Sequence, residues 1–324
     1  MTVITFLNSA LFRPLLALAA LMVVFTAGSA QAAAAKTSRK LFASPEEAVQ
    51  CLIAAAKNND KKELLAILGP GSQPIVSSGD PVADQTDRER FVKLYEEKNA
   101  IEGADSGKAV LTIGNEESRF PVPVVKQGTA WYFDAKAGRE ELLNRRIGRN
   151  ELEVIDILRE YVDAQREYAA KDWNGDGVTE FARKFRSTPG KKDGLYWETK
   201  EGEEESPFGS LVATATQEGY TPHAKKAKPA PFHGYYFKIL TAQGKNAEGG
   251  AFDYVVNGKM IGGFAIVAWP SKYGNSGVMT FVVNHDGVVY QKDLGPETAK
   301  IARSMKLYNP DETWKKVEAP IAAQ

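Results

Sequence analysis

The chain has little cysteine and little histidine, with one cysteine and three histidines among 324 residues. A single cysteine excludes a disulfide within the chain, so stability must come from packing. Cys51 lies in the middle of an apolar helical pattern, where a small packed residue is expected rather than a catalytic thiol. None of the histidines, His223, His233 and His285, has the spacing of a histidine zinc motif, so the sequence indicates no zinc site.

Neither sign of charge is in excess, because lysine plus arginine and aspartate plus glutamate both number 41. A nucleic-acid-binding protein needs a positive surplus to neutralise phosphates. We therefore expect no nucleic acid partner.

Beyond its first residues the chain has no apolar run long enough to cross a bilayer. The early run at residues 15–25 follows Arg13 and precedes the small residues around Ala30-Gln31-Ala32, which is the pattern of a secretory signal peptide. This run is about half of the roughly 20 residues that a membrane span requires. We expect a signal peptide at residues 1–32, a flexible N-terminus at 33–41, and a periplasmic or secreted protein with no membrane span after cleavage.

Helical patterns come first in the rest of the chain, and strand patterns follow them. Ser44-Pro45-Glu46-Glu47 is a capping box with proline at the first helical position, which predicts the start of a helix. Further helices are expected at 62–68 and 84–98, and strands at 109–113, 120–125 and 130–133, with a hairpin over 127–129. The sequence thus predicts an α+β cone-like domain over residues 42–137, in which a curved antiparallel sheet wraps a helix.

A second α+β domain is expected over residues 138–318, with a short tail at 319–324. Its helical pattern is interrupted at Gly148, and Asn150 followed by Glu153 predicts a new cap and a long helix. Strands are expected at 234–240, 252–256, 263–269, 278–283 and 287–292, the last two joined by a tight turn. The second domain is therefore predicted as a long helix plus an antiparallel sheet.

The segment that ends this long helix, KDWNGDGVTE at 171–180, places oxygen-bearing side chains on alternate positions around two glycines. Calcium binds about six to eight oxygens, and such a spacing can supply them. The candidate ligands are Asp172, Asn174, Asp176, the Val178 carbonyl and Glu180. Arg183 stands where an EF-hand has its bidentate glutamate, so the segment is not an EF-hand. It is predicted to be a calcium-stabilised loop, and the alternative is a cluster of Asx turns bonded to the local backbone.

Ser276, in the segment YGNSG at 273–277, is interpreted as part of a glycine-rich loop between strands. The nucleophile motif G-x-S-x-G is absent there, so a serine hydrolase is not indicated.

Phrases along almost the whole chain carry a resemblance to a known family. They include SPEEAVQ, LLNRRIGRNELE, YAAKDWNGDGVTEFARKF, GYYFKILTAQG and YGNSGVMTFVVNHDG. From about residue 42 to 317 the chain closely resembles the bacterial envelope family known as domain of unknown function 2950. The resemblance implies an exported bacterial protein and no established activity. The first half also resembles the cone-shaped nuclear-transport-factor-2-like domains, and the second half resembles the globular part of type IV pilins and pseudopilins.

The predicted function is that of an exported, non-enzymatic structural or interaction module with a calcium-stabilised loop, whose partner is an envelope protein or a polysaccharide. One alternative is a periplasmic hydrolase acting on peptide or glycan, which would need two carboxylates about 5–9 Å apart in an open cleft. Another is a carrier for a small apolar ligand. A pocket lined by Leu52, Phe91, Leu111 and Trp131 would favour the carrier.

Overall fold

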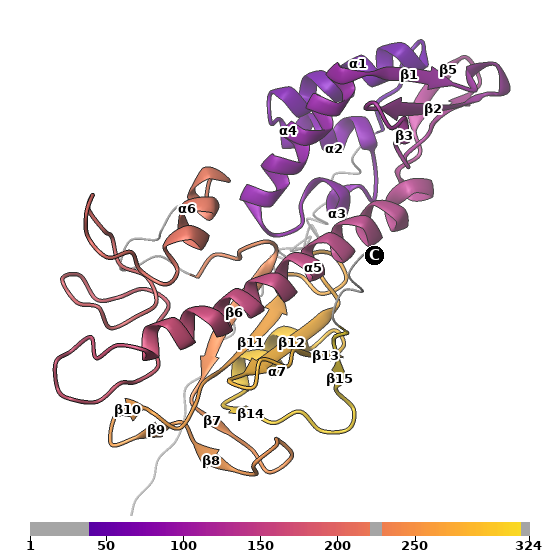
Figure 1. Cartoon of the computed structure of the whole chain (residues 1–324). Coiled ribbons are helices and arrows are strands. Elements are labelled where there is room, and N and C mark those ends of the chain that lie inside the picture. The colour runs from indigo at the N-terminus through magenta and orange to yellow at the C-terminus, as the bar shows by residue number, and fades with distance from the viewer. Residues whose placement is uncertain (1–38, 221–228, 319–324) are drawn as a thin grey trace, which may run out of the picture. The chain divides into compact units, whose positions relative to one another are not determined.

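The computed structural model describes residues 39–220 and 229–318, which form an α+β architecture as the sequence predicts (Figure 1). The predicted signal peptide, residues 33–38 of the predicted flexible N-terminus, and the predicted tail lie outside the described residues. Within the described ranges, no helix is long and apolar enough to cross a membrane.

Four helices open the described chain, and the first begins as the capping box predicts. The helices are α1 (Pro45–Lys57), α2 (Lys61–Leu68), α3 (Gln73–Val76) and α4 (Pro81–Glu97). The Ser44 hydroxyl accepts a hydrogen bond of 3.1 Å from the Glu47 N–H. In return, the Glu47 carboxylate accepts one of 2.7 Å from the Ala43 N–H, so two free donors at the helix start are satisfied.

An antiparallel sheet follows these helices. Its strands are β1 (Asn99–Glu102), β2 (Lys108–Ile113), β3 (Ser118–Arg119), β4 (Val124–Gln127) and β5 (Ala130–Phe133), with a short 3₁₀ helix, η1 (Ala104–Ser106), after β1. The order is β1-β2-β4-β5, and β3 pairs with β2. The predicted hairpin is confirmed, because Gln127 pairs with Ala130. The predicted strand at 120–125 is wrong in extent, since Pro121 and Pro123 have no N–H to donate and β4 begins only at Val124.

The long helix α5 (Ala135–Ala169) is continuous, so the predicted break at Gly148 and the predicted cap at Asn150 are wrong. Gly148 lies on the exposed side, where its cost of about 1 kcal/mol relative to alanine is offset by packing elsewhere along the helix. Asn150 does not cap a helix start. It is only 4% exposed, and its side-chain amide donates a 2.8 Å hydrogen bond to the Ser276 carbonyl.

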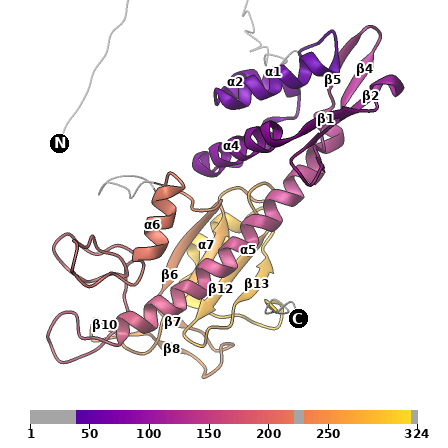
Figure 2. The ribbon, with the colours of Figure 1, turned by 45° about the horizontal axis from the view of Figure 1, so that its top comes forward.

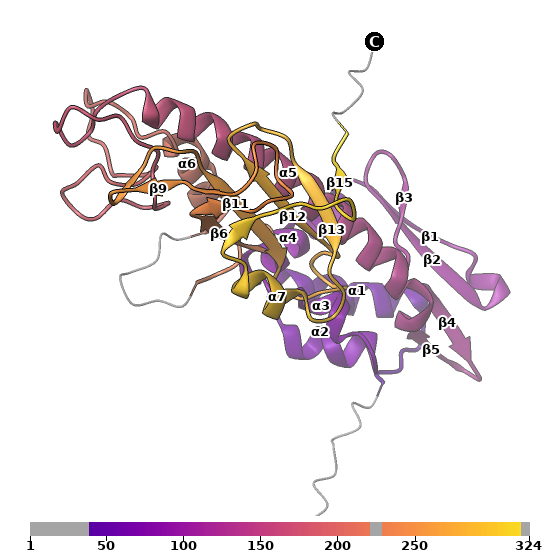
Figure 3. The ribbon, with the colours of Figure 1, turned by 90° about the horizontal axis from the view of Figure 1, so that it is seen from below.

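A second antiparallel sheet has the order β15-β13-β12-β11-β6. Its strands are β6 (Tyr235–Leu240), β11 (Ala265–Pro270), β12 (Met279–Asn284), β13 (Tyr290–Asp293) and β15 (Lys315–Lys316). Helix α5 crosses one face of this sheet, and α7 (Thr298–Ser304) lies against the other (Figures 2 and 3). Every residue of β11, which lies between β12 and β6, is buried, because both faces of the sheet are covered there.

Smaller elements complete the described chain. They are α6 (Gly209–Gln217), β7 (Ala242–Gln243), β8 (Phe252–Asp253), β9 (Val255–Val256), β10 (Lys259–Met260) and β14 (Leu307–Tyr308). The predicted strand at 252–256 is wrong as a single strand. The N–H of Tyr254 donates to the Thr241 carbonyl, and β8 and β9 pair with different partners on either side of it.

Two hydrophobic cores lie on either side of the middle of α5. One gathers residues between Phe42 and Ala135, and Leu142 of α5 packs against it. The other gathers residues between Val154 and Tyr308. The predicted domain boundary at residues 137/138 falls inside α5, and the division into two domains stays a prediction.

Candidate functional site

A pocket of about 330 Å³ lies among α1, α2, α4 and the first turns of α5. Twelve of its lining residues are apolar, and they include Leu52, Leu64, Leu68, Phe91, Leu94 and Leu142. Eight of the others are charged. Of the four residues that the carrier hypothesis placed around a pocket, Leu52 and Phe91 line it, whereas Leu111 and Trp131 are buried in the core.

Helix α4 brings charge into this apolar site. Its two most buried residues are charged, Asp84 and Arg88, although its apolar residues Phe91 and Leu94 line the same pocket. Residues 84, 88 and 91 lie four and three positions apart, so they occupy one face of the helix. The face of α4 that lines the pocket therefore carries both charged and apolar side chains.

Arg88 is 9% exposed and forms no ion pair with any residue that the structure describes. One terminal nitrogen, Nη1, donates a 3.3 Å hydrogen bond to the Val76 carbonyl. Its Nε and its other terminal nitrogen, Nη2, are buried with no acceptor among the described residues. Burial lowers the pKa of Arg88, because the charged form loses hydration, although nearby acidic groups oppose this shift.

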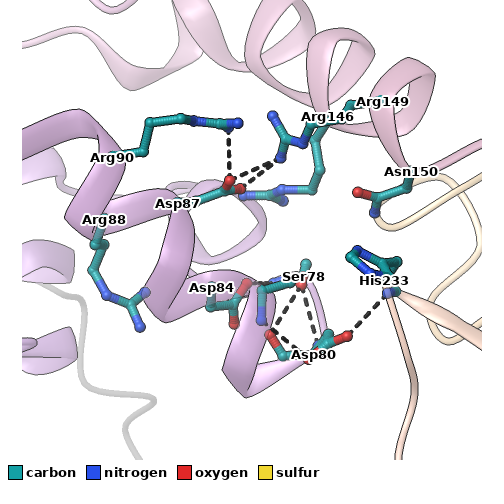
Figure 4. Close-up of polar contacts among 12 residues, drawn as sticks. Ser78, Asp80, Asp84, Asp87, Arg88, Arg90, Arg146, Arg149, Asn150 and His233 are labelled. Carbon is teal, nitrogen blue, oxygen red and sulfur yellow. Dashed lines mark hydrogen bonds and ion pairs between the residues drawn. The ribbon is translucent and has the colours of Figure 1, made fainter. Parts of the chain in front are cut away.

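Asp84 is the nearest acidic counterpart on the same helix. Its Oδ1 accepts a 2.8 Å hydrogen bond from the Ser78 N–H, while its Oδ2 is buried without a partner in the described ranges. Figure 4 draws no dashed line between the Arg88 guanidinium and Asp84. The two opposite charges therefore lie one turn apart without forming a direct contact.

Asp87, one turn after Asp84 on α4, forms the main ion pairs of the site (Figure 4). Arg149 of α5 donates to both of its oxygens at 2.8 and 2.9 Å, and Arg90 donates to Oδ1 at 2.8 Å. These contacts join α4 to α5 and place Asp87 between two guanidinium groups.

Arg146 lines the α5 side of the pocket and is bound entirely by neutral acceptors. It donates to the carbonyls of Pro74 and Ile75 at 2.7 and 2.6 Å, and to the Asn275 side chain at 2.7 Å. Burial lowers its pKa as well. Its contacts tie α3, α5 and the loop before β12 together, and no carboxylate of the described residues forms an ion pair with it.

A polar cluster next to the pocket holds the start of α4. Asp80, 1% exposed, caps the helix through Oδ1, which accepts from the N–H groups of Val82 and Ala83. Its Oδ2 accepts 2.9 Å hydrogen bonds from the Tyr220 hydroxyl and the Gly234 N–H. The cap of a pocket helix is thus bound by residues from much later in the chain.

His233 lies beside this cluster, between two glutamates. Its Nδ1 is 2.9 Å from Glu153 of α5, and its Nε2 is 3.1 Å from Glu218 after α6. Burial by itself lowers the pKa of His233, but the hydrogen bond to Glu153 and the charges of Glu153, Glu218 and Asp80 raise it above its ordinary value. The histidine acts as a charged bridge when it is protonated.

The predicted calcium loop is a run of Asx turns. Asp172 accepts hydrogen bonds from the N–H groups of residues 174, 175 and 177, and the last of these contributes most to lowering its pKa. Asn174 and Asp176 each accept from the N–H two residues ahead. The two glycines have positive φ, +73° and +85°, as this turn requires.

Two further contacts concern the proposed ligands. Lys259 forms an ion pair with Asp176, and Glu180 accepts hydrogen bonds from the Asn174 amide and the Met260 N–H. Val178 is exposed. Within residues 39–220 and 229–318, no group of three or more His, Cys, Asp or Glu side chains is arranged to hold a metal. A full calcium shell would also need the Asn174 and Val178 oxygens, so the loop stays a candidate.

The serine, cysteine and histidine residues considered in the sequence analysis take part in packing or in loop hydrogen bonds where the structure describes them. Ser276 is fully buried, and its hydroxyl accepts a 3.0 Å hydrogen bond from the Lys272 N–H, so it is part of the loop as predicted. Cys51 is half-buried beside the first core. His285 packs against the rings of Tyr254 and Phe264, and His223 lies outside the described residues.

The charged part of the pocket is what sequence reasoning missed. The spacing of Asp84, Arg88 and Phe91 could have indicated that charge shares a face with the apolar stripe. Likewise Leu142, Arg146 and Arg149 are spaced at four and three residues, which places them on one face of α5. The missing information was which faces meet, because α4 and α5 lie far apart in the sequence.

Comparison with known proteins gives a family and no activity. The family described as "Protein of unknown function (DUF2950)" matches residues 39–317. No curated protein and no solved structure matches the chain. The likenesses to pilins and to nuclear-transport-factor-2-like cones therefore stay predictions.

Proposed function

Since the chain belongs to the DUF2950 family, whose description assigns no activity, we propose from the site itself that this protein binds a small, largely apolar ligand. The observation that supports this proposal most directly is the pocket of about 330 Å³ with twelve apolar lining residues. Ligand pockets range from about 300 to 1,000 Å³, so this one fits a small molecule.

Binding is better supported than hydrolysis. The two carboxylates that line the pocket are Asp84 and Asp87. Both oxygens of Asp87 already accept hydrogen bonds from Arg149, and one oxygen of Asp84 accepts a hydrogen bond from the Ser78 N–H. A glycosidase-type pair needs two carboxyl groups that are free to contact the substrate, whereas Arg149 contacts both oxygens of Asp87.

Export and the calcium loop are parts of the same proposal. A leader of the signal-peptide type would place the binding protein in the periplasm or outside the cell. The loop at 172–180 would bind calcium through the side chains of Asp172, Asn174, Asp176 and Glu180 and the Val178 carbonyl. Calcium would stabilise the end of α5, and it would have to compete with Lys259 for Asp176.

Two tryptophan substitutions in the same helix test the binding proposal. Leu142 lines the pocket, whereas Leu152 is 66% exposed and lies outside it. We expect Leu142→Trp to fill the pocket and abolish binding of a neutral apolar dye such as N-phenylnaphthylamine, measured by fluorescence titration. Leu152→Trp is the control and should bind the dye like the wild type.

The proposal is wrong if the wild-type protein shows no saturable dye binding. It is also wrong if the Leu142→Trp variant, folded by circular dichroism, binds the dye as tightly as the Leu152→Trp variant.

A further inference from the structure

The charges around the pocket are not balanced. Six arginines line it, and only two carboxylates do, so the lining carries a surplus of four positive charges. Some of this surplus is offset just outside the pocket, where Glu141 pairs with Arg145 at 2.7 Å and Glu102 lies 3.7 Å from Arg119. Arg88 and Arg146 have no such partner among the described residues.

Arg88 is the most unusual of these groups, because it is buried and two of its nitrogens have no acceptor in the described part of the chain. Nearly all buried polar groups in proteins find a hydrogen-bond partner, and a buried charge without one is costly. Arg88 is one of the residues that line the cavity, so a ligand whose head group reached its guanidinium could supply the missing acceptor. Its unpaired donors therefore indicate the chemistry of the occupant.

The apolar wall and the guanidinium make different demands on one ligand. Leu52, Leu64 and Leu94 favour a hydrocarbon body, and Arg88 favours an anion with two oxygens in one plane or a phosphate. An uncharged apolar ligand would leave the buried donors unsatisfied. A small inorganic anion would leave the apolar walls in contact with water.

From these contacts we propose that the ligand is an anionic amphiphile, a medium-length hydrocarbon chain with a carboxylate or phosphate head that pairs with Arg88. This inference rests on the proposed function, since it names the ligand class of the same pocket. Asp84 does not replace the head group, because it lies one turn away on α4 and makes no direct contact with Arg88. Arg146, on the facing helix, adds positive charge to the same cavity.

Binding of three probes with the same chain length tests the inference. Decanol has no charge, whereas decanoate and decyl phosphate carry the two kinds of head group. In the full-length protein, displacement of the neutral dye should show that at least one anion binds roughly tenfold to a hundredfold more tightly than decanol, as expected for a charge-assisted hydrogen bond. The stronger of the two anions identifies the head group.

Substitutions at Arg88 test whether this residue causes the preference for an anionic head group. Arg88→Gln should bind decanol as before and lose the preference for the anion, and Arg88→Lys should keep part of it. Arg159, a half-buried arginine of α5, lies outside the pocket, so Arg159→Gln is the control and should keep all of the preference. Arg88→Gln should also fold at least as well as the wild type, because it removes a buried charge that has no partner.

The outcomes distinguish ligand binding by the pocket from the preference of Arg88 for an anion. If decanol binds and neither anion binds more tightly, the pocket is an apolar site and the inference is overturned while the proposed function stands. If no probe binds, both fail. If the anion preference survives in Arg88→Gln, the assignment to Arg88 is overturned.

Discussion

Two glycines of α5 should respond in opposite ways to the same substitution. Gly148 is exposed in the interior of the helix, and a Cβ atom added there would meet nothing within 4 Å. Gly138 is buried near the start of the helix, where an added Cβ would lie 2.4 Å from the Pro121 carbonyl oxygen and 2.6 Å from the Val122 nitrogen. Gly148→Ala tests the continuity of α5, and Gly138→Ala tests its close packing against the segment between β3 and β4.

The expected magnitudes follow from helix propensity and packing. Alanine is favoured over glycine inside a helix by about 1 kcal/mol, so Gly148→Ala should raise the free energy of unfolding by about that amount. Gly138→Ala gains the same propensity but forces backbone atoms apart, since no side chain can rotate away. Overpacking costs about 1–3 kcal/mol, and contacts with backbone place this site at the upper end, for a net loss of about 2 kcal/mol.

Thermal unfolding followed by circular dichroism measures both changes. A gain of 1 kcal/mol corresponds to a rise in Tm of about 2–4 °C in a domain of this size, and the Gly138→Ala variant should melt below the wild type. A destabilised Gly148→Ala variant would refute the uninterrupted helix. A Gly138→Ala variant as stable as Gly148→Ala would refute the close approach of α5 to Pro121.

Three further predictions concern the polar contacts. Because the folded pKa of His233 is raised, its charge stabilises the fold fully below about pH 6.5 and less as pH rises through the folded value. The stability difference between wild type and His233→Gln should therefore shrink with increasing pH, and a difference that grows would contradict the bridge. Asn150→Ala should cost about 1–3 kcal/mol in urea unfolding, because the Ser276 carbonyl loses its donor; an unchanged midpoint would show that water replaces it. Calcium at about 100 times its dissociation constant should stabilise the fold by about 2.7 kcal/mol. Lys259→Ala should strengthen this binding, and no heat in calorimetry with either protein would leave the loop as a hydrogen-bonded turn.

Local signals in the sequence predicted local structure well. The capping box at Ser44 predicted the start of α1, because all of its contacts lie within four residues. The hairpin of β4 and β5 was equally accessible, since its turn and its register belong to one short segment. The α+β class followed from the change of hydrophobic period along the chain.

The errors and omissions depend on contacts between distant segments. Asparagine is a residue type that favours helix caps. The Asn150 amide instead donates to the Ser276 carbonyl, so a tertiary contact overrides the local preference. The charged part of the pocket was not predicted either, because it also depends on contacts between distant segments. Arg149 pairs with Asp87 across 62 positions, and no local pattern shows which helix faces will meet.

Asp80 has a consequence for the order in which the protein is assembled. One of its oxygens caps α4 from within three residues, so the helix can start as soon as it is synthesised. The other oxygen binds partners 140 and 154 residues later, and such long loops close slowly. During folding, the N-terminal half would expose this carboxylate until its donors from later in the chain reach it. The pocket helix would reach its final position only after Tyr220 and Gly234 have bound Asp80.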